Sequence, residues 1–129
     1  MIINHLIVGS QDVPASTQFY CEFLGFKTTD DDPGAKGGQV LEHDQCELLI
    51  IPFPQEKLPN PAHFAFEVST LDEFKRVLQK AETMDLSPRS MPSKASAPGT
   101  TEFVRGKNKY QLFYVYDPSG VNLEVMVKL

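Results

Sequence analysis

The strongest constraint on the fold is an order of predicted elements that occurs twice along the chain. A strand, a helix and three strands are predicted within residues 1–52, and the same order is predicted again within residues 62–129. Residues 53–61 separate the two copies and are rich in proline, which disfavours both helix and central strand. The pattern predicts one α+β domain, residues 1–129, made of two βαβββ modules joined by the linker 53–61.

In the first module, the helix is predicted from its end signals. Asp12 is a typical N-cap and Pro14 fits the first turn, because an N-cap side chain accepts an unpaired backbone N–H and proline lacks that donor. Gly25 is typical of the residue that ends a helix. Apolar and β-branched segments predict the strands at residues 2–8, 26–29, 39–43 and 46–51.

The second module begins with a predicted strand, His63–Val68. Thr70 and Glu73 have the spacing of a capping box, which predicts a helix after that strand. Residues 86–100 are rich in serine and proline and predict a weak strand and a mobile loop. Two strong strands are predicted at the end of the chain, at residues 110–116 and 121–127, around a turn at residues 117–120.

The overall composition excludes some classes of partner. The chain has 41% hydrophobic residues, a net charge of −5 and a pI near 5.1. Because it has no large cluster of Lys or Arg, nucleic acid and anionic membrane surfaces are disfavoured as partners. No apolar run reaches the roughly 20 residues that span a bilayer, and residues 1–13 lack the pattern of a signal peptide. We expect a soluble, cytoplasmic protein.

Each module carries a histidine in its first strand and a glutamate in its last strand. His5 and His63 both lie seven residues before the predicted helix N-cap, and Glu47 and Glu124 lie within apolar strands. Taken singly, such a histidine is typical of a strand boundary and such a glutamate of an outward-facing edge. Taken together, these four residues predict a shared metal site, because carboxylates in apolar strands are costly unless paired or metal-bound.

The predicted ligand set favours a divalent first-row metal. Two imidazoles and two carboxylates without thiolates suit Ni, Zn, Co, Mn or Fe, and the two cysteines, expected buried and reduced, lack metal-site spacing. Four ligands on an octahedral ion leave two positions open, as in catalytic sites. Such an ion polarises a bound carbonyl, and Glu124 or Glu47 is the candidate general base.

Several segments give the chain a family resemblance. These segments are "DVPASTQFYCEFLGF", "CELLIIP", "HFAFEV" and, as the most specific, "YDPSGVNLEV". The chain resembles the vicinal oxygen chelate superfamily, which includes glyoxalase I, bleomycin-resistance proteins and extradiol dioxygenases. The resemblance implies paired βαβββ modules that form a curved mixed-sheet cup around a metal, usually in a homodimer. It also implies that the metal ligands are His5, Glu47, His63 and Glu124.

The resemblance leaves the substrate open. Glu47 is similar to the fourth ligand of glyoxalase I, but Gly9 stands where bacterial glyoxalase I has an arginine. Tyr114 matches a pocket tyrosine of fosfomycin-resistance enzymes and is a candidate substrate-binding residue; a core aromatic is the alternative.

These inferences predict a metal-dependent, glyoxalase-like lyase or isomerase acting on a small α-hydroxycarbonyl or thioester substrate. The alternatives are a drug- or metabolite-binding resistance protein without catalysis and an Fe(II) extradiol dioxygenase. Five basic residues are interpreted as ordinary surface charge: Arg89, Lys94, Arg105, Lys107 and Lys109. The alternative for Arg89 and Lys94 is that their loop covers the pocket, and the alternative for the other three is contact with an anionic substrate. His43, beside Asp44, is interpreted as a surface residue.

Overall fold

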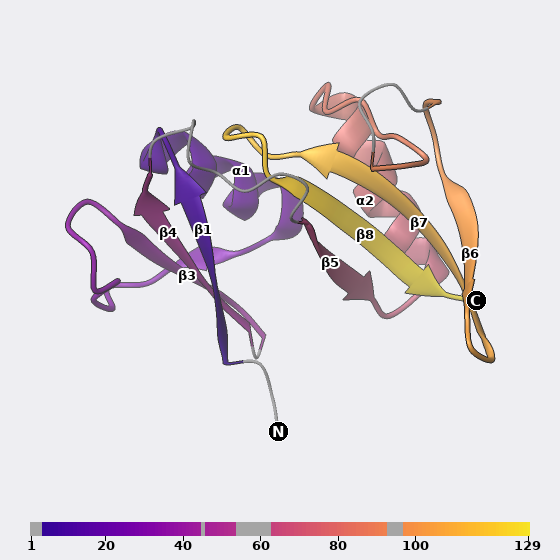
Figure 1. Ribbon diagram of the computed structural model, residues 1–129, viewed down its shortest axis with the longest axis horizontal. Helices are drawn as coiled ribbons and strands as arrows, with labels where there is room; N and C mark the ends of the chain where they lie inside the picture. Colours follow the sequence, from indigo (N-terminus) through magenta and orange to yellow (C-terminus); the bar gives the residue numbers. More distant parts are fainter. Residues whose placement is uncertain (1–3, 45, 54–62, 93–96) are drawn as a thin grey trace. The chain divides into compact units, whose positions relative to one another are not determined.

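The protein was analysed as a computed structural model, which describes residues 4–44, 46–53, 63–92 and 97–129 (Figure 1). Its contacts divide the chain into two compact units. The first comprises Met1–Asn60 with Asp117–Val121, and the second comprises Pro61–Tyr116 with Asn122–Leu129. Neither helix that the structure describes is long and apolar enough to cross a membrane.

The first unit contains a four-stranded mixed sheet and one helix. Its strands lie in the order β1-β4-β3-β2, and β1 runs parallel to β4. In chain order the elements are β1 (His5–Ser10), α1 (Val13–Leu24), β2 (Lys27–Thr28), β3 (Gln39–His43) and β4 (Cys46–Pro52).

The core of the first unit lies between this sheet and α1. Asp12 caps the helix by accepting the backbone N–H of Ala15 at 3.0 Å, and Gly25 ends it with a positive φ of 78°. The fully buried Leu48 and Ile50 on β4 alternate with half-buried neighbours, while Tyr20 and Phe23 are buried on the helix. Because strand side chains alternate between faces, the opposite face of the sheet carries His5 and the exposed Ile7.

The second unit repeats the topology of the first. Its strands lie in the order β5-β8-β7-β6, and β5 runs parallel to β8. Its elements are β5 (His63–Val68), α2 (Leu71–Thr83), β6 (Thr101–Arg105), β7 (Asn108–Tyr116) and β8 (Asn122–Lys128). The predicted α+β class and the repeated βαβββ order are confirmed.

Helix α2 covers one face of the second sheet (Figure 1). Phe74 on the helix packs edge-on against Phe113 on β7, with ring centroids 5.4 Å apart, and Leu123 and Val125 on β8 are fully buried. Thr70 accepts the backbone N–H of Glu73 at 3.1 Å, as the predicted capping box requires. The side chains of β8 that alternate with this core, Asn122, Glu124 and Met126, therefore lie on the other face of the sheet.

Two details differ from the sequence prediction. The weak strand predicted within residues 86–100 is wrong: among the described residues of this range, 86–92 and 97–100, there are only isolated bridges from Arg89, and the strand lies at Thr101–Arg105. Prolines at 88, 92 and 98 explain this, since each removes a ladder donor. The cysteines, Cys21 and Cys46, are free as expected but half-buried, and burial raises the pKa of both thiols.

One prediction falls largely outside the described residues and another falls outside them in part. Only Phe53 of the linker 53–61 is described, and residues 93–96 of the predicted loop are not. The first strand was predicted at residues 2–8; the described strand begins at His5 and continues to Ser10.

Candidate active site

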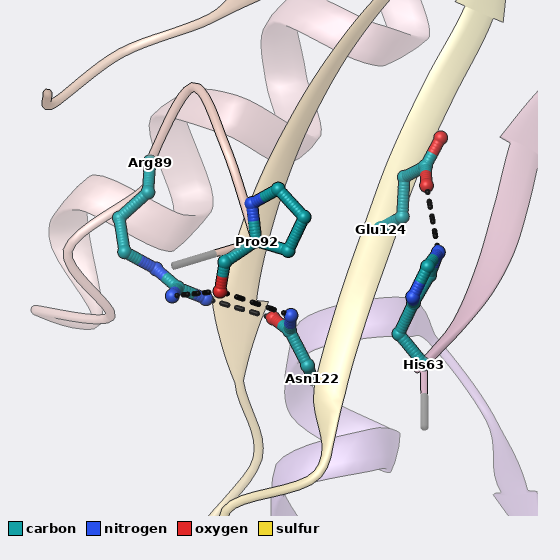
Figure 2. A network of polar contacts seen from close by, with 5 residues as sticks. All are labelled: His63, Arg89, Pro92, Asn122 and Glu124. Carbon is teal, nitrogen blue, oxygen red and sulfur yellow. Dashed lines mark hydrogen bonds and ion pairs between the residues drawn. The ribbon is translucent and has the colours of Figure 1, made fainter. Parts of the chain in front are cut away.

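A buried carboxylate lies on the face of the second sheet that is opposite to α2. Glu124 on β8 is only 6% exposed, and its Oε2 lies 3.4 Å from Nε2 of His63 on β5 (Figure 2). The side chain of His63 is 41% exposed, so this pair joins a buried acid to an accessible imidazole. The strand alternation explains the pairing, because His63 and Glu124 lie on the same face of neighbouring parallel strands.

Tyr114 completes this cluster. It lies directly opposite Glu124 in the ladder of β7 and β8, and its ring meets that of His63 edge-on at 6.0 Å. Burial, the charge of Glu124 and a hydrogen bond to that carboxylate raise the pKa of Tyr114 to about 12, although the charge of Arg105 opposes this. The Tyr114 hydroxyl therefore stays protonated at neutral pH and acts as a hydrogen-bond donor.

Arg89 fixes one end of the same face. It donates hydrogen bonds to Asn122 Oδ1 at 2.8 Å and to the Pro92 carbonyl at 2.9 Å (Figure 2). Its guanidinium lies 3.9 Å from the ring centroid of Tyr116. Asn122 also donates from Nδ2 to Pro92 at 3.2 Å, which closes the network. This network holds residues 89–92 against β8, two residues before Glu124.

The interpretation of Arg89 as ordinary surface charge is wrong, because its side chain is only 7% exposed. Its burial depends on Asn122 and Tyr116, which are distant in sequence. Sequence reasoning missed both Arg89 and Asn122. The position of Asn122 was nevertheless a signal, since it shares a strand face with Glu124 in an otherwise apolar strand.

The turn before β8 is held by a second buried acid. Asp117 is 4% exposed and accepts hydrogen bonds from the Tyr20 hydroxyl and from the backbone N–H groups of Ser119 and Val121, each at 2.8 Å. Burial raises the pKa of Asp117, and these hydrogen bonds partly offset that effect. Burial raises the pKa of Tyr20, and the charge of Asp117 and the hydrogen bond to it raise that pKa further. The Asp-Pro-Ser-Gly signal thus corresponds to a satisfied, rigid turn.

The first unit presents a different His–Glu pair. His5 on β1 and Glu47 on β4 are direct partners in the parallel ladder, so both side chains lie on one face. His5 is exposed, and its Nδ1 lies 2.9 Å from Oδ1 of Asn4. Within the part of the chain that the structure describes, no ion pair joins His5 to Glu47.

The register of the two pairs differs by two residues. The partner of His5 is Glu47, whereas the partner of His63 is Asn122 and Glu124 lies opposite Ala65. Two residues of strand are about 7 Å, and an even shift keeps the glutamates on the same face of their sheets. Glu47 and Glu124 therefore lie on equivalent faces of their two sheets, but not at equivalent positions relative to the histidine of each module.

The described residues do not gather a complete set of metal ligands. Across residues 4–44, 46–53, 63–92 and 97–129, no group of three or more His, Cys, Asp and Glu side chains lies close enough to hold a metal ion. His43 lies beside Asp44, with Nδ1 and Oδ2 3.2 Å apart, and the exposure of both side chains agrees with the interpretation of a surface pair.

Comparison with known proteins identifies the family. A family model described as Glyoxalase/Bleomycin resistance protein/Dioxygenase superfamily matches residues 2–125. The chain belongs to this superfamily. The match covers both modules, including all four predicted ligands, and it confirms the family resemblance of the sequence.

Several solved structures have a fold similar to that of the whole chain. An integron cassette protein from the mobile metagenome of V. cholerae is 20% identical to this chain. The match covers 98% of this chain and 94% of that protein, with a TM-score of 0.74. Oxidase ChaP-H2 is 24% identical over 100% and 94% of the two chains, with a TM-score of 0.74. A lactoylglutathione lyase from Agrobacterium tumefaciens is 20% identical over 98% and 92%, with a TM-score of 0.67. At these identities the likeness shows the fold alone. No curated protein matches the sequence.

The donor atoms of both pairs fit a divalent metal. Imidazole nitrogen and carboxylate oxygen are ligands that first-row metals share, and neither pair includes a thiolate. In this superfamily member, Glu124 is a buried carboxylate whose oxygens face an accessible imidazole and a protonated tyrosine. A buried carboxylate needs such partners, because desolvation of an unpaired charge is costly. The second unit thus holds one imidazole and one carboxylate in contact with each other.

Proposed function

We propose that the protein is a metal-dependent, glyoxalase-like lyase or isomerase that acts on a small α-hydroxycarbonyl or thioester substrate. The proposed metal ligands are His5, Glu47, His63 and Glu124. The observation that carries this proposal is the contact of the buried Glu124 with His63, beside Tyr114 on the same sheet face. Structural pairing alone is a weaker explanation, because a buried charged pair seldom stabilises a fold more than apolar residues do.

The metal ion, the general base and Tyr114 have distinct proposed roles. A bound divalent ion would supply Lewis-acid polarisation of a substrate carbonyl. Glu124 accepts the proton from the adjacent carbon, with Glu47 as the alternative base. Tyr114 stays protonated, and in the proposed complex its hydroxyl turns from the Glu124 carboxylate to donate its hydrogen bond to a substrate oxygen, which stabilises negative charge that develops there.

A complete ligand set requires both His–Glu pairs. In the proposed assembly, the pairs meet either between the two modules of one chain or between modules of two chains in a homodimer. Native mass spectrometry of the metal-loaded protein distinguishes these arrangements. A monomer that retains its metal supports pairing within the chain, and loss of the metal on dissociation supports pairing across the dimer.

The experiment that tests the proposal is a measurement of metal content in matched variants. The wild type is expected to retain a divalent metal after dialysis, and His63→Ala and Glu124→Gln are expected to lose it. His43→Ala is the matched control, because His43 also lies beside a carboxylate but on the exposed surface. Full metal occupancy in His63→Ala would refute the assignment.

The register difference favours one second candidate, an oxygen-using Fe(II) enzyme. If Glu47 is displaced from the position that Glu124 occupies, His5, His63 and Glu124 remain as a 2-His-1-carboxylate set with a free face for dioxygen. A fold neighbour named Oxidase ChaP-H2 is compatible with this chemistry. Oxygen consumption with catechols under ferrous conditions tests it; this candidate requires activity that survives Glu47→Gln.

A further inference from the structure

The face that carries Glu124 and Tyr114 continues along the sheet to Arg105. Side chains directly opposite each other in an antiparallel ladder lie on the same face. Leu112 lies opposite both Met126 and Thr101, Phe103 lies opposite Tyr110, and Tyr114 lies opposite Glu124. Because residues two apart in a strand share a face, Arg105 lies on the same face as Phe103 and Tyr114.

The residues between Tyr114 and Arg105 form an apolar floor. Leu112, Met126 and Tyr114 make one buried cluster, and Tyr110 packs against it. Phe103, which extends this floor at the edge strand β6, is 43% exposed. Tyr110 and Tyr114 are four residues apart, or about 14 Å along an antiparallel strand. The polar cluster and Arg105 therefore stand at two ends of a mainly apolar strip, and Lys128 lies on its β8 side, opposite Tyr110.

Arg105 is an accessible cation whose position is ordered by Phe103. Its guanidinium lies 5.5 Å from the centroid of the Phe103 ring, within the range of a cation–π contact. The nearby Lys109 is engaged by Glu102, with Nζ and Oε2 2.6 Å apart. Within the described residues, no carboxylate forms an ion pair with Arg105.

We propose that Arg105 binds a carboxylate at the far end of the substrate. The substrate then has chelating oxygens at one end, an apolar body of several carbons on the floor of Leu112, Tyr110 and Phe103, and an anionic group at the other end. This inference rests on the proposed function, because it takes the Glu124 end of the strip as the place of the chemistry. It identifies a specificity residue that sequence reasoning interpreted as surface charge.

The first test uses two matched chelators with the nickel-loaded protein. 2-Hydroxydodecanedioate and 2-hydroxydodecanoate share the chelating end and a chain long enough to follow the strip from Tyr114 to Tyr110, and only the first has a terminal carboxylate. Calorimetry of the wild type is expected to show about tenfold tighter binding of the diacid, the usual size of a charge-assisted hydrogen bond. Arg105→Gln is expected to remove that difference and to leave binding of the monoacid unchanged.

Lys107→Gln is the matched control. Lys107 is exposed in the turn next to Arg105, and its substitution changes the net charge by the same amount. This variant is expected to retain the preference for the diacid. Equal losses in Arg105→Gln and Lys107→Gln, or no loss in Arg105→Gln, would overturn the inference, since a general electrostatic effect would then be sufficient.

A metal-free measurement separates this inference from the proposed function. Octanoate and its neutral analogue octanamide are titrated into metal-free protein, and the Nε–H resonance of Arg105 is followed by NMR. Octanoate is expected to shift this resonance and octanamide is not. If nickel fails to bind but the octanoate shift is present, the metal-dependent function is wrong and the carboxylate site stands. If nickel binds and octanoate gives no shift, the carboxylate site is wrong.

Discussion

The two modules share one topology but present their His–Glu pairs in different ways. In the first module, His5 is exposed and stands directly opposite Glu47 without an ion pair between the described side chains. In the second, Glu124 is buried, lies two residues further along its strand and contacts the ring of His63. Identical strand order thus leaves room for a two-residue change in register that preserves the face but moves the carboxylate by about 7 Å.

The modules differ most in what surrounds each carboxylate. Glu124 lies beside Tyr114, and the Arg89 network holds the same strand two residues earlier. On the equivalent face of the first sheet, Ile7 is 58% exposed. The second module therefore holds its carboxylate in ordered polar contacts, whereas the first presents an exposed histidine and an exposed Ile7 on the corresponding face. The predictions below test this asymmetry.

The largest expected effect is on metal affinity. Glu124→Gln is expected to weaken metal binding by more than about 100-fold, because even residues that only support ligands contribute 10–100-fold. Glu47→Gln is expected to cause a smaller loss of about tenfold, since its module lacks the ordered contacts of Glu124. Competition with a coloured chelator measures both affinities. Equal losses would remove the proposed asymmetry between the modules.

Arg89 tests whether the second module is held together as described. Arg89→Met removes two hydrogen bonds and leaves Asn122 Oδ1 without its donor, while the Pro92 carbonyl keeps Asn122 and Tyr116 as donors, so we expect a loss of about 2 kcal/mol in the free energy of unfolding. Urea denaturation measures it. Arg76→Met, at an exposed position on α2, is the control and is expected to change stability by less than about 0.5 kcal/mol.

Tyr20 tests the corresponding polar contact of the first unit. Tyr20→Phe removes the hydrogen bond to Asp117 and is expected to cost about 1.5 kcal/mol near pH 7. Burial raises the pKa of Asp117, and the hydrogen bond from Tyr20 partly offsets this rise because it favours the ionised carboxylate. The stability that this hydrogen bond provides is therefore present above the pKa of Asp117 and is lost as the pH falls through that pKa. Urea melts at several pH values measure the difference. A cost that grows in acid would contradict this account.

Tyr114 tests the proposed donor role. Tyr114→Phe is expected to lower kcat/KM by about tenfold, the usual scale of one lost hydrogen bond to developing charge. Because the pKa of Tyr114 is about 12, the hydroxyl does not titrate between pH 5 and 9. The pH–rate profile of the variant is therefore expected to keep the limbs of the wild type. A lost limb in that range would show that Tyr114 acts as an acid or base.

The smallest effects concern the helix caps, for which the two modules are expected to behave alike. Asp12→Ala and Thr70→Ala each remove one side-chain acceptor of a backbone N–H and are expected to cost about 1 kcal/mol. Thermal denaturation measures both. A much larger loss from either variant would mean that its cap also supports contacts beyond the helix end.

Local signals predicted most of the fold. Asp12, Gly25 and Thr70 mark helix ends through their own hydrogen bonds or backbone angles, and these depend on a few neighbouring residues. The strand Thr101–Arg105 was missed because four of its five residues are exposed, so it has no apolar alternation. The position of this strand depends on pairing with β7, which a local pattern does not contain.

The candidate site was predictable only in part. Glu124 and His63 stood out as polar residues in apolar strands, and the structure brings them together. Arg89 did not stand out, since its burial depends on a hydrogen bond to Asn122, 33 residues away in sequence. The two-residue difference in register between the modules also depends on strand pairing. The four-ligand set that includes His5 and Glu47 remains a prediction.

The measurement that tests the central claim most directly is a cobalt titration of the metal-free protein, followed by visible absorption. The proposed site predicts saturable binding of Co²⁺ to the wild type and to His43→Ala, with absorption bands typical of nitrogen and oxygen ligands. It predicts that these bands are lost in His63→Ala. Bands of full intensity in His63→Ala, or equal losses in His63→Ala and His43→Ala, would contradict the account.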